Sequence, residues 1–417
     1  MKKNTHFDVI VVGGGPSGMM AAGTIAQSGK SVLLIEKNQK LGEKLSITGG
    51  GRCNITNAEY DVHELLSHYG KAGKFLYSPF SQFGVQDTVD FFEKAGLPLV
   101  VEARKRAFPK TQKAKDVVRV MVKYARQPSV TLLTDAKVTK VVAKDDNVVS
   151  VQVEKTIYTA DEFVFATGGV SAPQTGSTGD GFRFLTKLGH TVVQPTPDIV
   201  PLRMEEDWVK SISGVTLSFM KITFFVSGRK AFSKKGKILF THFGVSGPLI
   251  LNSAREVSEL LYEGEVRAEI DMYPDTDLGT LEKNVIKVFD GHKNKTLKNV
   301  LDLVVPRGVA KGMLHLLDEK IVDTKVHSIT KEERKMIVHL LKKMPLTVEG
   351  LMGFDWAVIS DGGVSLEEVD TKTMRSKLFK NLYLTGDLLH INRPSGGYSL
   401  QLCWTSGYVV GKSIARK

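Results

Sequence analysis

Three glycines near the start of the sequence, Gly13, Gly15 and Gly18, have the spacing G-x-G-x-x-G. In a dinucleotide site the first glycine permits a tight turn, the second lets a pyrophosphate approach the backbone, and the third lets a helix pack closely on a strand. Glu36 follows Gly18 by eighteen residues, where a carboxylate would accept hydrogen bonds from a ribose hydroxyl. The spacing predicts a dinucleotide site and leaves NAD and FAD open, because both carry an adenosine ribose.

The elements needed to position these residues occur in the required order. Residues 7–12 are an apolar run rich in Val and Ile, which predicts a buried strand. Residues 19–27 then predict a helix of small and unbranched side chains, and residues 31–35 a second strand. The free N–H groups and the positive dipole end of the helix would face the phosphates. This order favours a nucleotide site over an ordinary glycine-rich turn.

Two later segments repeat the design of a strand followed by glycine, FVFATGG at 163–169 and LYLTGD at 382–387. If these strands and the first one lie in a single parallel sheet, their carboxyl ends converge on the same crevice. The last strand then belongs to the first domain, although it is separated from it by a long stretch of other sequence. Residues 190–350 are therefore expected to be an insertion.

Changes of character along the chain predict three regions. Residues 1–189 and 365–417 are expected to form a discontinuous Rossmann-like dinucleotide-binding domain. Residues 190–277 and 345–364 contain partly alternating apolar and polar residues, which predict an antiparallel β-domain. Residues 278–344 have helical apolar spacing and predict an inserted helical subdomain. The expected fold class is α/β, and the DGG sequence at 361–363 predicts a tight turn.

The composition narrows the possible partners. The 417 residues contain no apolar stretch long enough to cross a membrane, and the short run after MKKNTHF leads into glycines rather than a cleavage site. We therefore expect a cytoplasmic protein that acts on a small molecule and does not bind a membrane. The net charge of +12 admits a nucleic-acid partner, but no recognition motif accompanies it, so this is the less favoured interpretation. The oligomeric state stays open.

The two cysteines, Cys53 and Cys403, lie far apart in the sequence and form no C-x-x-C motif. With no Cys/His cluster beside them, they predict neither a disulfide framework nor a metal site. A packed thiol is the favoured interpretation of each, and a disulfide-redox role for Cys53 is the weaker alternative.

The loop GGGPSG with its ribose acid, the middle ATGG and the late GD before a helix resemble a two-dinucleotide-fold flavoprotein of the glutathione reductase superfamily. Four further segments narrow this resemblance: SITGGGRCNITN (46–57), ATGGVSAPQTGSTGDG (166–181), LFTHFGVSGPLIL (239–251) and LTGDLLHINRPSGGYSLQ (384–401). Together they resemble the HI0933-like (YhiN/BaiN-like) family of FAD-dependent oxidoreductases, over nearly the whole chain.

The resemblance implies FAD as cofactor and a β-domain that caps the flavin. Arg52, Cys53 and Asn54 would lie near the pyrophosphate and flavin, Val138 near the adenine, and Asp387 at the ribityl chain. The implied cofactor-binding residues are Gly13, Gly14, Gly15, Pro16, Ser17, Gly18, Glu36, Lys37, Lys44, Gly51, Arg52, Cys53, Asn54, Val138, Ala166, Thr167, Gly168, Gly386, Asp387, Gly397, Tyr398 and Leu400. Asp387 departs from the family's usual Glu, and residues 390–393 depart from its usual Asp- and Gly-containing turn.

His242, Tyr398 and Arg52 are the candidate catalytic residues. His242 could donate a proton to substrate and Arg52 could bind an anion, although structural roles are the favoured interpretation of all three. The expected reaction passes a hydride through flavin N5 between a donor and a small molecule. No second glycine fingerprint lies between 190 and 350, so NAD(P)H would dock transiently or another donor would act. A flavin-dependent tRNA-modifying enzyme and a non-enzymatic redox sensor are the alternatives.

Overall fold

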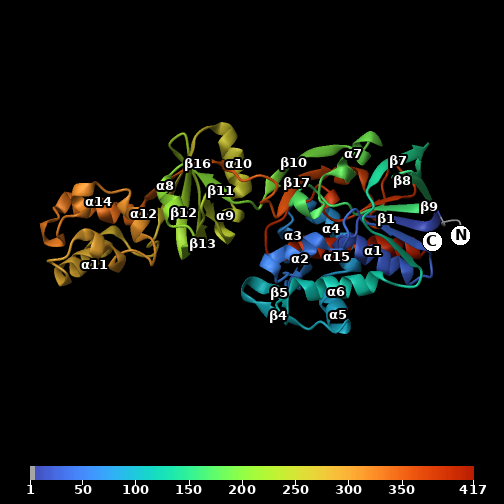
Figure 1. Ribbon diagram of the computed structural model, residues 1–417, viewed down its shortest axis with the longest axis horizontal. Helices are drawn as coiled ribbons and strands as arrows, with labels where there is room; N and C mark the ends of the chain where they lie inside the picture. Colours follow the sequence, from blue (N-terminus) through green and yellow to red (C-terminus); the bar gives the residue numbers. More distant parts are fainter. Residues whose placement is uncertain (1–4) are drawn as a thin grey trace. The chain divides into compact units, whose positions relative to one another are not determined.

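The computed structural model describes residues 5–417 and divides the chain into two compact units (Figure 1). The first unit runs up to Pro197 and resumes at Val358, and the second unit is Asp198–Ala357. These boundaries lie inside the predicted ones at 190 and 364. The reason is that β10 (Val192–Asp198) pairs with β17 (Ile359–Val364), and Val364 forms a parallel bridge with Leu389 of the first unit.

A parallel sheet forms the centre of the first unit. Its strands are β6 (Val130–Leu133), β2 (Val32–Ile35), β1 (His6–Val12) and β9 (Thr156–Phe165) in that order, with β18 (Leu382–Leu384) beside β9. Antiparallel β8 (Asn147–Val153) and β7 (Val138–Lys144) extend it. The strands are apolar because both faces of the sheet are covered, as the fully buried β2 illustrates.

The carboxyl ends of the parallel strands are level with one another. Val12 pairs with Ile35 and with Phe165, Ile35 pairs with Leu133, and Phe165 pairs with Leu384. The prediction that three distant strand-then-glycine segments share one parallel sheet is therefore confirmed. The turns that follow these strands all leave the same edge of the sheet.

Two long buried helices pack against each other beside this sheet, α1 (Pro16–Ala26) and α15 (Tyr398–Ala415). The predicted start of the first helix at Met19 was wrong by three residues. Pro16 is pre-organised for the first helical position and Gly15 caps the helix, so the helix begins directly at the glycine loop. The close approach requires small residues, since a Cβ on Gly407 would lie 2.4 Å from the Ser17 carbonyl oxygen.

The remaining elements of the first unit surround this core. They are α2 (Glu43–Ile47), β3 (Thr56–Asn57), α3 (Val62–Ser67), α4 (Gly73–Gln82), α5 (Val85–Lys94), β4 (Leu99–Glu102), β5 (Arg106–Pro109), α6 (Ala114–Ala125) and α7 (Asp180–Lys187). Strands β3, β5 and β4 form a small antiparallel sheet of their own.

A closed six-stranded barrel forms the second unit together with helices. The barrel order is β11 (Leu202–Met204), β14 (Gly244–Ser246), β13 (Arg229–Phe240), β12 (Thr216–Val226), β15 (Val266–Asp271) and β16 (Met344–Leu351). The helices are α8 (Asp207–Ser211), α9 (Pro248–Leu251), α10 (Ala254–Glu263), α11 (Leu278–Gly291), α12 (Ala310–Leu314), α13 (Glu319–Val322) and α14 (Lys331–Lys342). Barrel and helices share one hydrophobic core, so the predicted helical subdomain is continuous with the β-domain in its packing.

Two local expectations differ from the structure. Residues 248–251, within the range expected to form an antiparallel β-domain, form the short helix α9, because Pro248 after Gly247 starts a helical turn. The predicted tight turn at 361–363 is part of strand β17. Gly362 and Gly363 have φ angles of 129° and 123°, and a Cβ on Gly362 would lie 2.6 Å from Pro195 Cα. These glycines allow a close strand contact rather than a turn.

A buried histidine connects the two chain segments of the first unit that precede and follow the second unit. His190 Nδ1 lies 2.7 Å from Glu368 Oε2, and its Nε2 lies 3.0 Å from Ser376 Oγ. The Ser376 hydroxyl oxygen accepts the backbone N–H groups of Leu378 and Phe379, so its own proton goes to Nε2. The neutral imidazole therefore donates from Nδ1 to Glu368.

This arrangement predicts a pH-dependent stability. Burial lowers the pKa of His190 below its ordinary 6.5, and the Glu368 carboxylate opposes part of that shift. Below pH 6.5 the unfolded chain therefore binds more protons at this site than the folded one, and the free energy of unfolding falls as the pH is lowered. Urea unfolding across this range should show a weaker pH dependence for His190→Gln than for the wild type. Equal slopes for the two proteins would contradict the assignment.

Candidate dinucleotide-binding site

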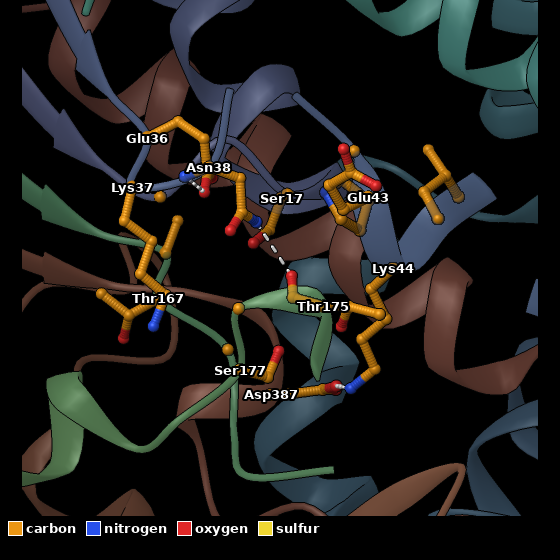
Figure 2. A pocket seen from close by; sticks show the side chains of 18 of the residues that line it. Ser17, Glu36, Lys37, Asn38, Glu43, Lys44, Thr167, Thr175, Ser177 and Asp387 are labelled. Carbon is orange, nitrogen blue, oxygen red and sulfur yellow. Dashed lines mark hydrogen bonds and ion pairs between the residues drawn. The ribbon is translucent and has the colours of Figure 1, made fainter. Parts of the chain in front are cut away.

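A pocket opens at the level carboxyl edge of the parallel sheet, where the turns after β1, β2, β9 and β18 meet (Figure 2). Its empty volume, which includes space open to solvent, is about 1180 Å³. Predicted residues that line it are Gly13, Gly15, Pro16, Ser17, Glu36, Lys37, Lys44, Val138, Ala166, Thr167, Gly168, Asp387 and Leu400. An elongated ligand suits such a pocket.

The glycine loop has the geometry that its spacing predicts. Gly13 has a φ of 109°, and a Cβ there would lie 2.3 Å from the Ala166 carbonyl oxygen. A Cβ on Gly18 would lie 1.9 Å from the Gly13 carbonyl oxygen, so this glycine is required by packing. A Cβ on Gly15 would meet nothing within 4 Å and would project into open space at the start of α1. Of the three glycines, only Gly15 could carry a side chain without a clash with another protein atom. It is also the glycine whose backbone a pyrophosphate would approach.

Glu36 is held in place beside this loop. Its Oε2 accepts the Gly14 N–H at 2.7 Å, and its Oε1 accepts the Asn38 N–H at 2.8 Å. The next residue, Lys37, extends to Asp180 Oδ2 at 2.8 Å. Figure 2 shows Glu36 and Lys37 at one end of the pocket and Lys44 and Asp387 at the other. A carboxylate with both oxygens anchored by backbone is rigid enough to orient a ribose.

Three charged side chains meet at the other end of the pocket. The Asp387 carboxylate is paired with the Arg393 guanidinium, and its Oδ2 lies 3.7 Å from Lys44 Nζ, which also donates to Ser171 Oγ. Burial alone would raise the pKa of Asp387, but the Arg393 and Lys44 charges together hold it below its ordinary value. Burial lowers the pKa of Lys44, and Asp387 opposes part of that shift. The site thus carries a fixed anion between two cations.

Several features of this pocket fit a bound dinucleotide. Thr167 lines the pocket, and its buried hydroxyl has no hydrogen-bond partner among residues 5–417. The open space at Gly15 coincides with the first turn of α1, whose N–H groups have no partner within the helix. A pyrophosphate accepts such hydrogen bonds and favours the positive end of the helix dipole. The residues present therefore fit FAD, with the glycine loop to hold the pyrophosphate and Glu36 to hold the ribose.

Nine predicted site residues are absent from the pocket lining. Gly14, Gly18, Gly51, Arg52, Cys53, Asn54, Gly386, Gly397 and Tyr398 do not line the pocket. Gly397 backs onto another segment, because a Cβ there would lie 2.3 Å from the Thr56 carbonyl carbon. Tyr398 is buried against Tyr69, whose hydroxyl donates to the Tyr398 carbonyl. Burial raises the pKa of Tyr398 to about 12, which does not favour it as a proton donor.

Arg52 serves the local structure. Its guanidinium pairs with Glu102, its Nε donates to Gln112 Oε1 at 2.6 Å, and its Cζ lies 4.1 Å from the centre of the Phe108 ring. Its predicted position beside pyrophosphate and flavin stays a prediction. The other candidate, His242, belongs to the second unit, where it is exposed and its ring centre lies 4.9 Å from that of Phe243. Its role, and the capping of the flavin by the β-domain, stay predictions.

Both cysteines are buried free thiols, and burial raises the pKa of each to about 12. At about pH 8 only roughly one thiol in ten thousand would then be ionised, and the thiolate is the reactive form. We expect neither Cys53 nor Cys403 to react with a chromogenic disulfide reagent in the native protein, and both to react in urea. Rapid modification of one thiol in the native protein would instead support the redox role for Cys53.

Sequence reasoning missed two parts of the site. Residues 175–177 and Asp180 line the pocket and form its wall beside Lys37. Their signal was present, because they belong to the Gly- and Ser-rich segment 166–181. Arg393, the partner of Asp387, carried no recognisable spacing and fell in the segment where the sequence departs from its family.

A parallel sheet with a glycine loop, an anchored ribose acid and a far C-terminal strand at one pocket defines a flavoprotein of the FAD-binding Rossmann class. Residues 7–413 match the model of the HI0933-like protein Rossmann domain, and the chain belongs to this family of FAD-dependent oxidoreductases. Among residues 5–417, no helix is long and apolar enough to span a membrane, and no group of metal-ligating side chains occurs.

Two relatives are similar over almost their whole length. A 3-dehydro-bile acid delta(4,6)-reductase of Clostridium scindens is 28% identical over 415 residues, 98% of either chain. A ribosomal RNA dihydrouridine synthase of Escherichia coli is 26% identical over 409 residues, again 98% of either chain.

Solved structures share the fold. The chain superposes on a flavocytochrome c3 fumarate reductase in its open conformation with a TM-score of 0.55 and 16% identity, over 100% of this chain and 79% of the other. A 3-ketosteroid delta1-dehydrogenase from Sterolibacterium denitrificans gives a TM-score of 0.55 with 14% identity, over 99% and 100% of the two chains.

Proposed function

We propose that this protein is an FAD-dependent reductase that adds two electrons to a carbon–carbon double bond conjugated to a carbonyl group. The observation that carries the proposal is the single pocket at the level strand ends, with a glycine loop and Glu36 at one end and Asp387 with the start of α15 at the other. Such a pocket suits one extended dinucleotide whose reactive ring lies toward Asp387.

The activities for which the two relatives are named support this choice of substrate chemistry. The bile acid reductase acts on double bonds conjugated to a 3-oxo group, and dihydrouridine arises by saturation of the uracil double bond conjugated to a ring carbonyl. In the proposed reaction a hydride adds to the double-bond carbon distant from the carbonyl, and a proton adds to the carbon beside it. NAD(P)H is the proposed hydride source, and it leaves as NAD(P)⁺.

FAD supplies the two-electron chemistry when it is bound. The protein's own contribution is to position the ligands and to stabilise the charge that develops on them. Lys44 lines the pocket next to Asp387, so its ammonium group could stabilise negative charge that develops on a ligand there. The N-terminus of α15 would act in the same direction, because Ser399 and Leu400 of its first turn also line the pocket.

Anaerobic mixing separates the proposal from its alternatives. NADH or NADPH should bleach the flavin absorbance, and a conjugated enone or a uridine-containing RNA should then restore it with saturation of one double bond. Bleaching without reoxidation by any conjugated acceptor would exclude the proposed reaction. A flavin that neither nicotinamide reduces would favour a redox sensor or another electron donor.

One observation favours uridine in RNA as the second, more specific candidate substrate. A protein with a net charge of +12 attracts a polyanion such as RNA. A small acidic substrate would need only one cation in the site and would not account for so large an excess of basic residues. The test is RNA binding across a salt series. A steep fall in affinity with salt supports this candidate, and no binding at low salt excludes it.

A further inference from the structure

We propose that the hairpin turn between β4 and β5, residues 102–106, is a docking site for the phosphate backbone of RNA. This inference rests on the RNA form of the proposed function and names the surface that would hold that substrate. Glu102 on β4 lies opposite Arg106 on β5 in the strand register, so the turn consists of Ala103, Arg104 and Lys105. It belongs to the first unit, which also contains the dinucleotide pocket.

The turn has an unfavourable backbone for its residues. Arg104 and Lys105 have φ angles of 61° and 56°, in the left-handed region that Gly and Asn occupy most readily. Two consecutive long cationic side chains in this region are strained, and a turn selected only for stability would use Asn or Gly. The strain indicates that the side chains themselves are required at this position.

The charges on this surface are only partly neutralised. Lys105 pairs with Glu59, and Arg52 behind the turn pairs with Glu102. Arg104, Lys110 and Lys113 are exposed, and within residues 5–417 none of the three forms an ion pair with a carboxylate. Arg106 Cζ lies 5.7 Å from the centre of the Phe108 ring, and its Nε donates to the Ala103 carbonyl. Arg104 lies in the turn itself, and Lys110 and Lys113 follow the end of β5, so the cations available to phosphate oxygens extend from the turn to the far end of the hairpin.

Hydrogen bonds connect the turn to the pocket. Asn57 Nδ2 donates to the Arg104 carbonyl oxygen at 3.2 Å and to the Gly396 carbonyl oxygen at 3.1 Å. Gly396 lies in the loop that leads into α15, and Ser399 and Leu400 at the start of that helix line the pocket. The backbone of the turn is therefore held, through Asn57, to the loop that leads into the helix at the α15 end of the pocket.

The sharpest test replaces both strained cations by Asn, in Arg104→Asn/Lys105→Asn. Asn relieves the left-handed strain, but the variant also loses the ion pair of Lys105 with Glu59, whose side chain is 14% exposed, so we expect the thermal midpoint to change little. Binding of a fluorescein-labelled uridine-rich RNA should weaken about tenfold at low salt. The slope of log affinity against log salt should become shallower by about 1 to 2, since each lost phosphate contact removes about 0.7–0.9.

A matched control removes two charges elsewhere in the same unit, in Lys140→Asn/Lys144→Asn on the exposed side of β7. This variant should retain the wild-type salt slope. Wild-type slopes in both variants would overturn the docking site while leaving the reductase proposal intact, and equal losses in both would overturn it in favour of net charge alone. FAD content and bleaching by NAD(P)H, measured in parallel, test the reductase proposal separately.

Discussion

A Gly15→Val variant will fold normally and lose affinity for FAD by at least about 100-fold, equivalent to about 3 kcal/mol. The new side chain meets no protein atom within 4 Å at its Cβ, and the Gly15 φ of −76° is accessible to valine. Its branches would occupy the space at the start of α1 where the pyrophosphate must approach the backbone. The folded protein therefore tolerates a change that the complex does not. Flavin fluorescence titration of the apoprotein measures the affinity.

Two control variants separate binding from folding. Gly350→Val also places a side chain in open space, on β16 of the second unit, and should leave FAD affinity unchanged. Gly18→Ala should fail to fold, because its Cβ would lie 1.9 Å from the Gly13 carbonyl oxygen. Wild-type FAD affinity in a folded Gly15→Val protein would show that the pyrophosphate does not lie against this loop.

An Arg393→Met variant will lose about 3–5 kcal/mol of unfolding free energy, the range found when one partner of a buried ion pair is removed. The Arg393 side chain is 1% exposed, and besides Asp387 it donates to the Ile391 carbonyl and to Ser399 Oγ. Without it, the Asp387 carboxylate would keep only the more distant Lys44 as a counter-charge. Urea unfolding of the apoprotein at neutral pH measures the loss.

The pH dependence and a control sharpen this prediction. The folded pKa of Asp387 lies below 3.8, so its contribution to stability is present above that value and is lost as the pH falls through the folded pKa. Removing Arg393 should reduce this acid dependence. The control Lys380→Met breaks a surface ion pair between Lys380 and Asp146. Because the Lys380 side chain is 73% exposed, this change should alter the free energy of unfolding little. Equal effects of the two substitutions would contradict a structural role for the buried pair.

The sheet and the glycine loop could be predicted because their signals are local. Strands β1, β9 and β18 are apolar runs that lead closely into a glycine, and the rule that the carboxyl ends of parallel strands meet at one edge then placed these turns together. The same reasoning found both ends of the pocket, Glu36 and Asp387. The small antiparallel sheet around Phe108 was not found, because its strands are short and carry charges.

The errors arise where a residue's partner is distant in sequence. The family resemblance placed Arg52 near the cofactor, and no pattern in the sequence indicated that Glu102 and Gln112 are the partners of its guanidinium. Gly362 and Gly363 were assigned to a turn, although their positive φ angles serve a contact with Pro195 and Leu388. The side-chain environment of Asp387 likewise depends on Arg393, whose role no pattern in the sequence indicates.

The identity of the bound cofactor tests the central claim most directly. The purified protein should be yellow, and denaturation should release FAD in an amount close to one molecule per chain. Reconstitution of the apoprotein should likewise require FAD rather than FMN or NAD. A colourless protein that cannot be reconstituted with FAD, or one that releases FMN, would contradict an extended dinucleotide lying from Glu36 to Asp387.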